Sequence, residues 1–339
     1  MRYPKKLEIG KYIGTTAPSS GITNPVNLER LNNVKYNLEM LGYQFKETPN
    51  VRTDEKGRSS TPRERAEQFM SLWEDDNVDA IISAGGGDFL NEMLDKLKWE
   101  RLKELEPKWF QGYSDNTGLT FLITTILDTA SIHGPTVKDF GMRKLHKSLT
   151  NSLELMKNKE IIQESYEKCE SNIWTERTDP YEEYNLQNDV EWKNLKGEEK
   201  INFTGRSIGG SFDVIMNLIG TKYDKVKEYI EKYKEDGIVW FLEIFEMTTP
   251  QIFNNLWQMK NAGYFENCNG IIFGRPLIIR EEYEINYEDI LKQFFKNMNI
   301  PVIYNADIGH VSPQISIVSG AIIEVESENG KGFIKNYLR

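Results

Sequence analysis

The chain has 339 residues, which corresponds to about two domains, and its 39% hydrophobic and 28% charged content excludes a disordered protein. Its two cysteines, Cys169 and Cys268, stand in no disulfide, zinc-finger or CxxC spacing. The net charge of −10 argues against a nucleic-acid-binding protein, because such affinity comes mainly from neutralising phosphates.

Apolar runs are short throughout the sequence. None approaches the roughly 18 uninterrupted residues of a membrane span. The basic start, residues 1–6, is not followed by an apolar stretch of signal-peptide length. We therefore expect a cytoplasmic protein that does not engage a membrane.

The first half of the chain alternates predicted strands and helices. Strands are expected at 7–16, 78–83, 109–113 and 131–135, and helices at 25–41, 62–76, 88–97, 116–129 and 141–157. Asn24-Pro25 is a helix start, and Thr61 with Glu64 forms a capping box. This order predicts an α/β domain over 1–162, with a parallel sheet of flavodoxin or amidotransferase type.

In such a sheet the functional site lies at the carboxyl ends of the strands. Four loops would fall on that edge, at 17–20, 85–87, 112–115 and 133–135.

The stretch 163–199 breaks this alternation. Acidic residues outnumber basic ones by eleven to four, which is typical of a solvated linker. The same stretch carries Trp174, Tyr181, Tyr184 and Trp192, and aromatic residues are unusual in a simple tether. We expect a partly ordered insert between two domains, with Trp192 packed against the second.

The remaining residues, 200–339, predict a second α/β domain with a mixed sheet and β-hairpins. Strands are expected at 203–208, 238–245, 270–273 and 302–305, with helices from 211, at 251–262 and at 289–298. Residues 315–338 read as hairpins, with Asn329-Gly330 as the turn signal.

Glu243 interrupts an otherwise apolar strand, residues 239–245. Burying an ionised carboxylate without a partner is very costly, so such a residue normally has a partner. The alternative is strand alternation that turns Glu243 to solvent, and the sequence leaves both open.

Only three histidines are present; His133 lies at the end of a predicted strand, and His310 lies in a glycine-containing loop after another. An imidazole titrates near neutrality, so either is a candidate general base, although a loop histidine is more often structural.

Ser114 lies in a tight turn between a predicted strand and a helix, in the run Gly112-Tyr-Ser-Asp-Asn116. A hydroxyl at such a turn is a candidate nucleophile, while helix capping by Ser114 or Asp115 is the plainer interpretation. The run Gly85-Gly86-Gly87 follows another strand and could present N–H groups to an anion. No metal-binding or nucleotide-loop motif is present, so we expect no metal and no cofactor.

Together these residues resemble one known family, the serine peptidases that comprise the LD-carboxypeptidases and the microcin C immunity proteins. Eight motifs occur in the family's order, across about residues 7–325: Ala17-Pro-Ser-Ser20, Gly85-Gly86, Gly112-Tyr-Ser-Asp115, His133-Gly-Pro135, Gly209-Gly210, Leu242-Glu243, Gly270-Ile-Ile-Phe-Gly-Arg-Pro276 and Gly309-His310. The long insert is more similar to the immunity-protein branch.

The resemblance implies roles for individual residues. Ser114 would be the nucleophile, His310 the general base and Glu243 the residue that orients the imidazole. The N–H groups of Gly86 and Asp115 would form the oxyanion hole. Substrate contacts are expected from Trp174, Tyr181 and Ser211, with Tyr181 stacking on an adenine. Departures from the family pattern stand at Ser211, Ile244 and Ile308.

The expected function is therefore hydrolysis of an amide bond near a carboxylate by a cytoplasmic homodimer. The substrate would be a small peptide or peptidyl-nucleotide, so that the enzyme detoxifies nucleotide antibiotics of this kind. One alternative is a murein LD-carboxypeptidase that releases a terminal D-amino acid from a tetrapeptide. Another is a non-catalytic, anion-binding or amidotransferase-like module.

Overall fold

A computed structural model describes residues 1–173 and 176–339, and it divides into two compact units. The first unit contains residues 1–161 and 176–183, and the second contains 162–173 and 184–339. The expected insert at 163–199 is therefore divided between the two units. In the described part of the chain, no helix combines the length and apolar character needed to cross a membrane.

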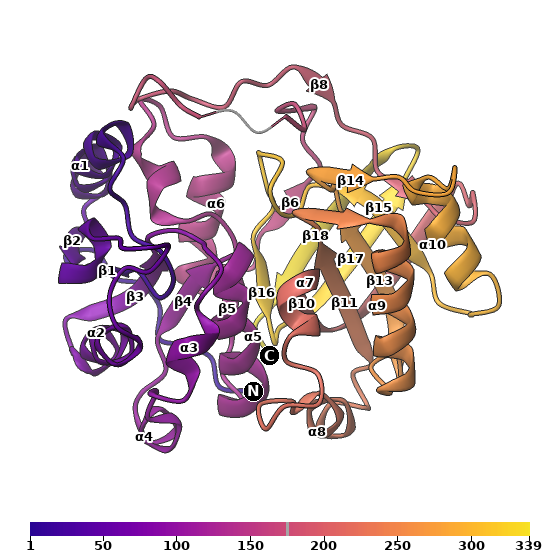
Figure 1. Cartoon of the computed structure of the whole chain (residues 1–339), viewed down its shortest axis with the longest axis horizontal. Helices are drawn as coiled ribbons and strands as arrows, with labels where there is room; N and C mark the ends of the chain where they lie inside the picture. Colours follow the sequence, from indigo (N-terminus) through magenta and orange to yellow (C-terminus); the bar gives the residue numbers. More distant parts are fainter. Residues whose placement is uncertain (174–175) are drawn as a thin grey trace. The chain divides into compact units, whose positions relative to one another are not determined.

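The first unit is built on parallel strands (Figure 1). Its strands run in the order β2-β1-β3-β4-β5, and every pairing among them is parallel. This is the flavodoxin-like order, as predicted. Their bounds are β1 (Tyr12–Thr16), β2 (Gln44–Glu47), β3 (Val78–Ser83), β4 (Trp109–Gly112) and β5 (Ser131–His133).

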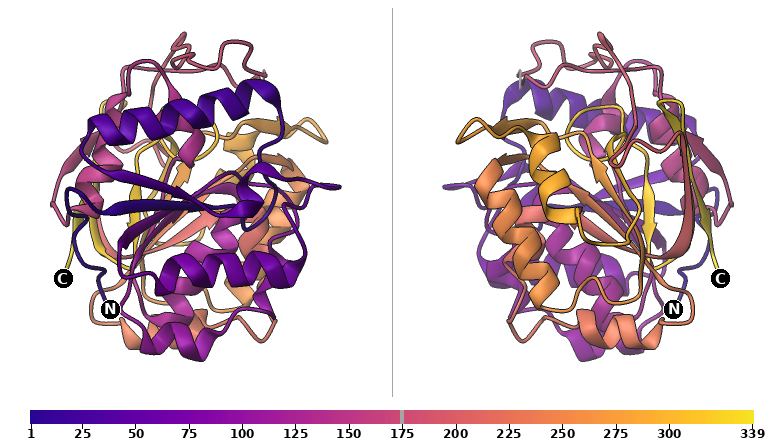
Figure 2. Two further views of the ribbon diagram at one scale, coloured as in Figure 1. Left: turned by 90° about the vertical axis from the view of Figure 1, so that its left-hand side faces the viewer. Right: turned by 90° about the vertical axis from the view of Figure 1, so that its right-hand side faces the viewer.

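Helices cover both faces of these strands, with α1 above and α2 below them in the left-hand view of Figure 2. The bounds are α1 (Pro25–Met40), α2 (Pro62–Glu74), α3 (Asn91–Leu94), α4 (Trp99–Glu104), α5 (Thr117–Leu127) and α6 (Lys147–Met156), with 3-10 turns η1 (Pro49–Arg52), η2 (Ser114–Asn116) and η3 (Val137–Gly141). The predicted starts are confirmed: the side chain of Asn24 caps α1, and Thr61 and Glu64 form the capping box of α2.

Two predicted helices of this unit were wrong in extent. The helix expected at 88–97 is reduced to the single turn α3. The helix expected from Gly141 begins at Lys147, where the imidazole of His146 accepts a hydrogen bond from the N–H of Ser148. Gly141 instead ends η3 and packs so closely on α1 that a Cβ there would overlap the Arg30 carbonyl. Residues 141–146 of the predicted helix therefore lie outside α6.

The second unit contains a mixed sheet, as predicted. Its order is β6-β18-β17-β10-β11-β13-β15-β9, parallel from β10 to β15 and antiparallel elsewhere. The bounds are β6 (Ile162–Glu164), β9 (Lys193–Asn194), β10 (Lys200–Ser211), β11 (Ile238–Glu243), β13 (Cys268–Gly274), β15 (Val302–Ala306), β17 (Ile322–Glu328) and β18 (Lys331–Tyr337). The predicted turn joins β17 to β18, with positive φ at both Asn329 and Gly330.

The remaining elements of this unit are short or lie beside the sheet. They are β7 (Lys168–Cys169), β8 (Asn188–Asp189), β12 (Glu246–Thr248), β14 (Ile278–Arg280) and β16 (Ile317–Ser319), with helices α7 (Phe212–Met216), α8 (Val226–Lys232), α9 (Thr249–Asn261) and α10 (Tyr287–Phe295).

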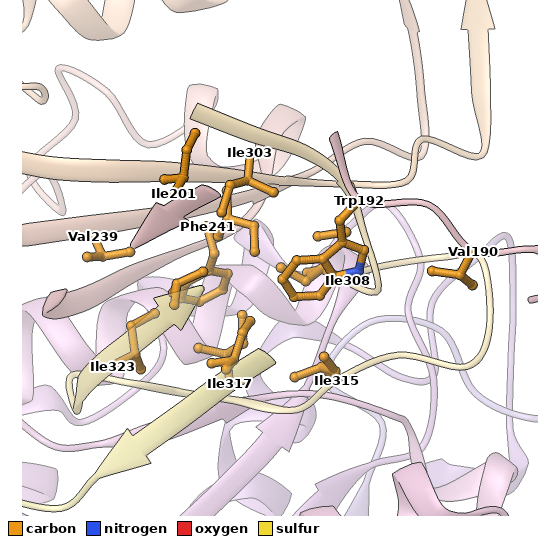
Figure 3. Packing of buried hydrophobic residues seen from close by; sticks show 14 of the residues in the cluster. Val190, Trp192, Ile201, Val239, Phe241, Ile303, Ile308, Ile315, Ile317 and Ile323 are labelled. Atoms are coloured by element: carbon orange, nitrogen blue, oxygen red, sulfur yellow. The ribbon is translucent and has the colours of Figure 1, made fainter. Parts of the chain in front are cut away.

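Trp192 packs into the core of the second unit, which confirms the interpretation of this aromatic residue as structural. Its side chain lies among the aliphatic residues of the sheet, near Ile308, and the residue is 2% exposed (Figure 3). Gly332 on β18 makes room for it, because a Cβ at that glycine would overlap the indole ring.

The indole of Trp192 also satisfies a buried charge. Its Nε1–H donates to Asp307 Oδ2 at 2.7 Å, and Arg275 Nη1 donates to Asp307 Oδ1 at 2.6 Å. Asp307 has no exposed surface. Burial raises the pKa of its carboxyl, and Arg275 and the indole N–H oppose that shift. The insert is thus joined to the core by a polar contact as well as by packing.

This contact predicts a stability effect. Trp192→Phe keeps an aromatic ring but removes a donor from a buried carboxylate, so it should lower the free energy of unfolding by about 2 kcal/mol or more. Trp257→Phe is the matched control, because Trp257 is 57% exposed on α9. Urea unfolding of both variants measures the difference. Equal midpoints for the two variants would contradict the assigned role of the indole N–H.

Candidate active site

The loops after β1, β3 and β4 meet at the carboxyl edge of the first unit's sheet, as predicted. Ser19 Oγ donates to Asp115 Oδ2 at 2.5 Å, and the same oxygen accepts from the N–H of Leu90 at 3.0 Å. Ser20 Oγ donates to the Gly86 carbonyl at 2.6 Å. These bonds fix the backbone of residues 86 and 115 relative to each other.

Ser114 occupies a strained turn at this edge. It is the first residue of η2, directly between β4 and α5, and its φ is +60°. A non-glycine residue in the left-handed region costs free energy that the surrounding structure must supply, and such strain is often found at functional sites. The turn has the strand-to-helix geometry of a nucleophile elbow, without the sequence motif.

Glycine is required on both sides of this serine. A Cβ at Gly86 would lie 2.9 Å from Ser114 Oγ, and one at Gly112 would lie 2.8 Å from the Cβ of Asn116. Asn116 then ties the turn to the loop after β3, because its side chain donates to the Gly85 carbonyl at 2.8 Å and accepts from Ser83 Oγ at 2.6 Å. The backbone of Gly86 therefore lies directly against the serine hydroxyl.

The second unit brings Glu243 and His310 together. Glu243 is the last residue of β11 and has no exposed surface, so it does not point to solvent. Its Oε2 lies 2.7 Å from His310 Nδ1. This contact answers the alternative that the sequence left open: Glu243 is buried, and an imidazole is its partner.

The loop that carries His310 is shaped to permit this contact. Gly309 has a φ of +93°, and a Cβ there would lie 2.6 Å from Glu243 Oε2, so only glycine fits. The ring of Phe245 lies 4.8 Å from the imidazole, centroid to centroid. Arg275 also donates to the carbonyls of Val311 and Pro313, which follow the histidine.

Ser211 stands next to Glu243 in the sheet. The two residues are register partners on β10 and β11, and Ser211 is 1% exposed. Its hydroxyl donates to Asp213 Oδ1 at 3.0 Å. Burial, and to a smaller extent the charge of Glu243, raise the pKa of the Asp213 carboxyl. Sequence reasoning missed Asp213, although a lone acid in the apolar start of a helix was a visible signal.

Three further residues were considered as site residues from the sequence, and each has its own environment. Tyr181 belongs to the first unit, where its hydroxyl donates to Glu29 Oε1 at 2.7 Å and its carbonyl accepts from the N–H of Arg143. Trp174 lies outside the described residues. His133 is fully buried at the end of β5, with its ring edge-on to Tyr113. His310, by contrast, has the Glu243 carboxylate at its Nδ1.

Each unit, taken by itself, contains side chains that can carry chemistry. An imidazole whose Nδ1–H donates to a carboxylate keeps Nε2 as a proton acceptor. A serine on a strained turn beside glycine N–H groups can act as a nucleophile.

Comparison with known proteins identifies the family of the chain. The family model described as the LD-carboxypeptidase N-terminal domain matches residues 13–134. The model described as the LD-carboxypeptidase C-terminal domain matches residues 204–325. Together these matches cover more than half of the chain.

Individual relatives match over almost the whole length. A Bacillus subtilis protein named "Probable murein peptide carboxypeptidase" is 25% identical, over 94% of this chain and 89% of its own. The microcin C7 self-immunity protein MccF of Escherichia coli is 23% identical, over 95% of this chain and 92% of its own.

Solved structures share the fold. The crystal structure of an MccF-like protein from Bacillus anthracis superimposes with a TM-score of 0.79 at 23% identity, over 100% of both chains. A structure of MccF itself, in complex with aspartyl sulfamoyl adenosine, has a TM-score of 0.78 at 20% identity, over 98% of both chains. With both domain models matched in order along the sequence, the chain belongs to the LD-carboxypeptidase family of peptidases.

Proposed function

We propose that this protein is a serine carboxypeptidase-type hydrolase that cleaves an amide bond near a carboxylate. Ser114 is the nucleophile, His310 the general base and Glu243 the residue that orients the imidazole. The observation that carries the proposal is the 2.7 Å contact between His310 Nδ1 and the buried Glu243. The strained turn at Ser114 supports it, since non-glycine residues held in the left-handed region cluster at functional sites.

The proposed reaction proceeds through an acyl-enzyme. Ser114 Oγ attacks the amide carbonyl while His310 Nε2 takes the hydroxyl proton, and the N–H groups of Gly86 and Asp115 donate hydrogen bonds to the oxygen that becomes negatively charged. The carbon–nitrogen bond then breaks, and the imidazolium returns the proton to the leaving amine. The same imidazole then deprotonates a water molecule, which attacks the ester carbonyl. The bond from the acyl carbon to Ser114 Oγ breaks, the imidazolium returns its proton to that oxygen, and the acid is released. Glu243 stabilises the imidazolium in both the acylation and the deacylation step.

For the substrate, we favour a peptidyl- or aminoacyl-nucleotide, so that the protein acts as a detoxifying enzyme. Support comes from the match to MccF over almost the whole chain and from the sulfamoyl adenosine compound in the MccF structure. Tyr181, on the ordered insert segment of the first unit, is the aromatic residue that we assign to base stacking. Ser211, beside Glu243, is assigned to substrate binding.

A murein tetrapeptide is the second candidate substrate. The observation in its favour is the relative named for murein peptides, which matches this chain at slightly higher identity than MccF. Both substrates contain an amide bond near a carboxylate, so the same three catalytic residues serve either reaction.

Ser114→Ala tests the nucleophile. The variant should lower kcat by about 10⁴-fold or more, because loss of a triad nucleophile removes the covalent route. Substrate affinity and the unfolding midpoint should change little. Ser71→Ala is the control, an exposed serine on α2 that should keep full activity. Product formation is followed by mass spectrometry on both substrates. Unchanged turnover in Ser114→Ala would contradict the assignment of Ser114 as the nucleophile and leave it a structural role in the turn.

Tyr181→Ala tests the substrate assignment. If the ring stacks on a nucleobase, KM for a peptidyl-adenylate analogue should rise about 10-fold or more, while KM for a murein tetrapeptide stays constant. Tyr181→Phe is the matched control, because it removes the hydroxyl bond to Glu29 but keeps the ring face. Trp174→Ala is measured alongside. Equal changes on the two substrates, or none, would contradict nucleotide recognition by Tyr181.

A further inference from the structure

Lys138 is a partly buried cation near the nucleophile turn that the sequence analysis did not single out. It lies in η3, five residues after the end of β5. A Cβ at Gly85 would lie 3.6 Å from Lys138 Nζ, while a Cβ at the next residue, Gly86, would lie 2.9 Å from Ser114 Oγ. The ammonium and the serine hydroxyl therefore flank the same short stretch of the loop after β3.

The backbone around Lys138 is held firmly. Its carbonyl accepts from Arg30 Nε at 2.7 Å, and two further residues on the same face of α1, Asn33 and Asn37, donate to the carbonyls of residues 140–142. On the other side, Gln111 of β4 donates to the Pro135 carbonyl at 2.7 Å. Hydrogen bonds on both sides thus fix the backbone that carries Lys138.

The ammonium itself lacks such support. Among the described residues, no oxygen forms a hydrogen bond or ion pair with Lys138 Nζ. The adjacent carboxylate, Asp139, forms an ion pair with Arg177. Burial lowers the pKa of Lys138, Asp139 opposes this, and the positive charges of Arg177 and Arg30 add to the lowering. A partly desolvated ammonium gains from an anion that a ligand brings to it.

Lys108, in the same unit, is a buried lysine whose ammonium has hydrogen-bond partners. It is 9% exposed and precedes β4, at the opposite edge of the sheet. Its ammonium donates to the carbonyls of Asp75 and Val78, each at 2.5 Å. Lys108 has a structural explanation within the fold, whereas Lys138 at the carboxyl edge has none.

We propose that Lys138 binds the carboxylate of the substrate next to the scissile amide, and so makes the enzyme select substrates with a free acid. The inference rests on the proposed function, which requires a carboxylate near the cleaved bond. An ammonium beside Gly85 would place that carboxylate close to the proposed oxyanion hole at Gly86. The partly desolvated position makes the ion pair stronger than one on the open surface.

The proposal is tested by binding, so that it does not depend on turnover. In the Ser114→Ala background, calorimetry compares a murein tetrapeptide with its C-terminal amide. The protein with Lys138 should prefer the free acid by about 30-fold or more, because truncating one partner of a desolvated ion pair is that costly. In Lys138→Met the preference should fall below about 3-fold. Lys108→Met, the matched control, should keep the full preference.

Stability gives a second readout without ligand. Lys138→Met removes an unsatisfied charge and should leave the unfolding midpoint unchanged or higher, whereas Lys108→Met should lower it. A retained acid preference in Lys138→Met, or no preference in the protein with Lys138, would overturn the proposal. If Lys138→Met weakens binding of a peptidyl-adenylate analogue and leaves binding of the murein tetrapeptide unchanged, the proposal is also overturned. The ammonium would then bind a phosphoryl group and not a carboxylate. Residual turnover in Ser114→Ala alone would instead count against the proposed nucleophile.

Discussion

Burial of the Glu243 carboxylate is the constraint that determines the position of the His310 loop in the second unit. An ionised carboxylate with no exposed surface needs a partner, and the imidazole of His310 supplies it at 2.7 Å. The loop can approach this closely only because residue 309 is glycine. The loop is fixed in turn by Asp307, which Arg275 and Trp192 hold in the core. A chain of polar contacts thus runs from the insert to the histidine.

In the first unit, glycines and polar contacts likewise fix the loops around Ser114. Ser114 needs a left-handed backbone, and the loops around it need close approach, so glycine stands at 86 and 112. The side chains of Ser19 and Asn116 then tie the three loops together through Asp115 and Gly85. These bonds use side chains to position the backbone groups at this edge of the sheet.

Local signals in the sequence predicted much of this arrangement. Strand β3, the caps of α1 and α2 and the turn at Asn329-Gly330 follow from nearest neighbours, and all are confirmed. The order of short motifs identified the family. One strand and one helix of the first half were missed, β2 and α4. Both are short and polar, so they carry no clear periodicity.

Long-range pairings could not be predicted in the same way. The Arg275–Asp307 bond joins residues 32 positions apart, and Trp192 reaches Asp307 from 115 positions away. Lys138 escaped notice because its significance is the lack of a partner among the described residues, which only the fold reveals. Whether Glu243 faces solvent was likewise open, because the strand is apolar on both of its faces.

We propose that the His310–Glu243 pair activates Ser114. A fluorophosphonate, which labels activated serines, tests this activation directly when the modified residue is mapped by mass spectrometry and the labelling rate is compared with that of Glu243→Gln. We expect one adduct, on Ser114, that forms about 10²-fold or more slowly in Glu243→Gln, because the amide no longer fixes the imidazole tautomer. Adduct at another residue, or equal labelling rates in the two proteins, would contradict it.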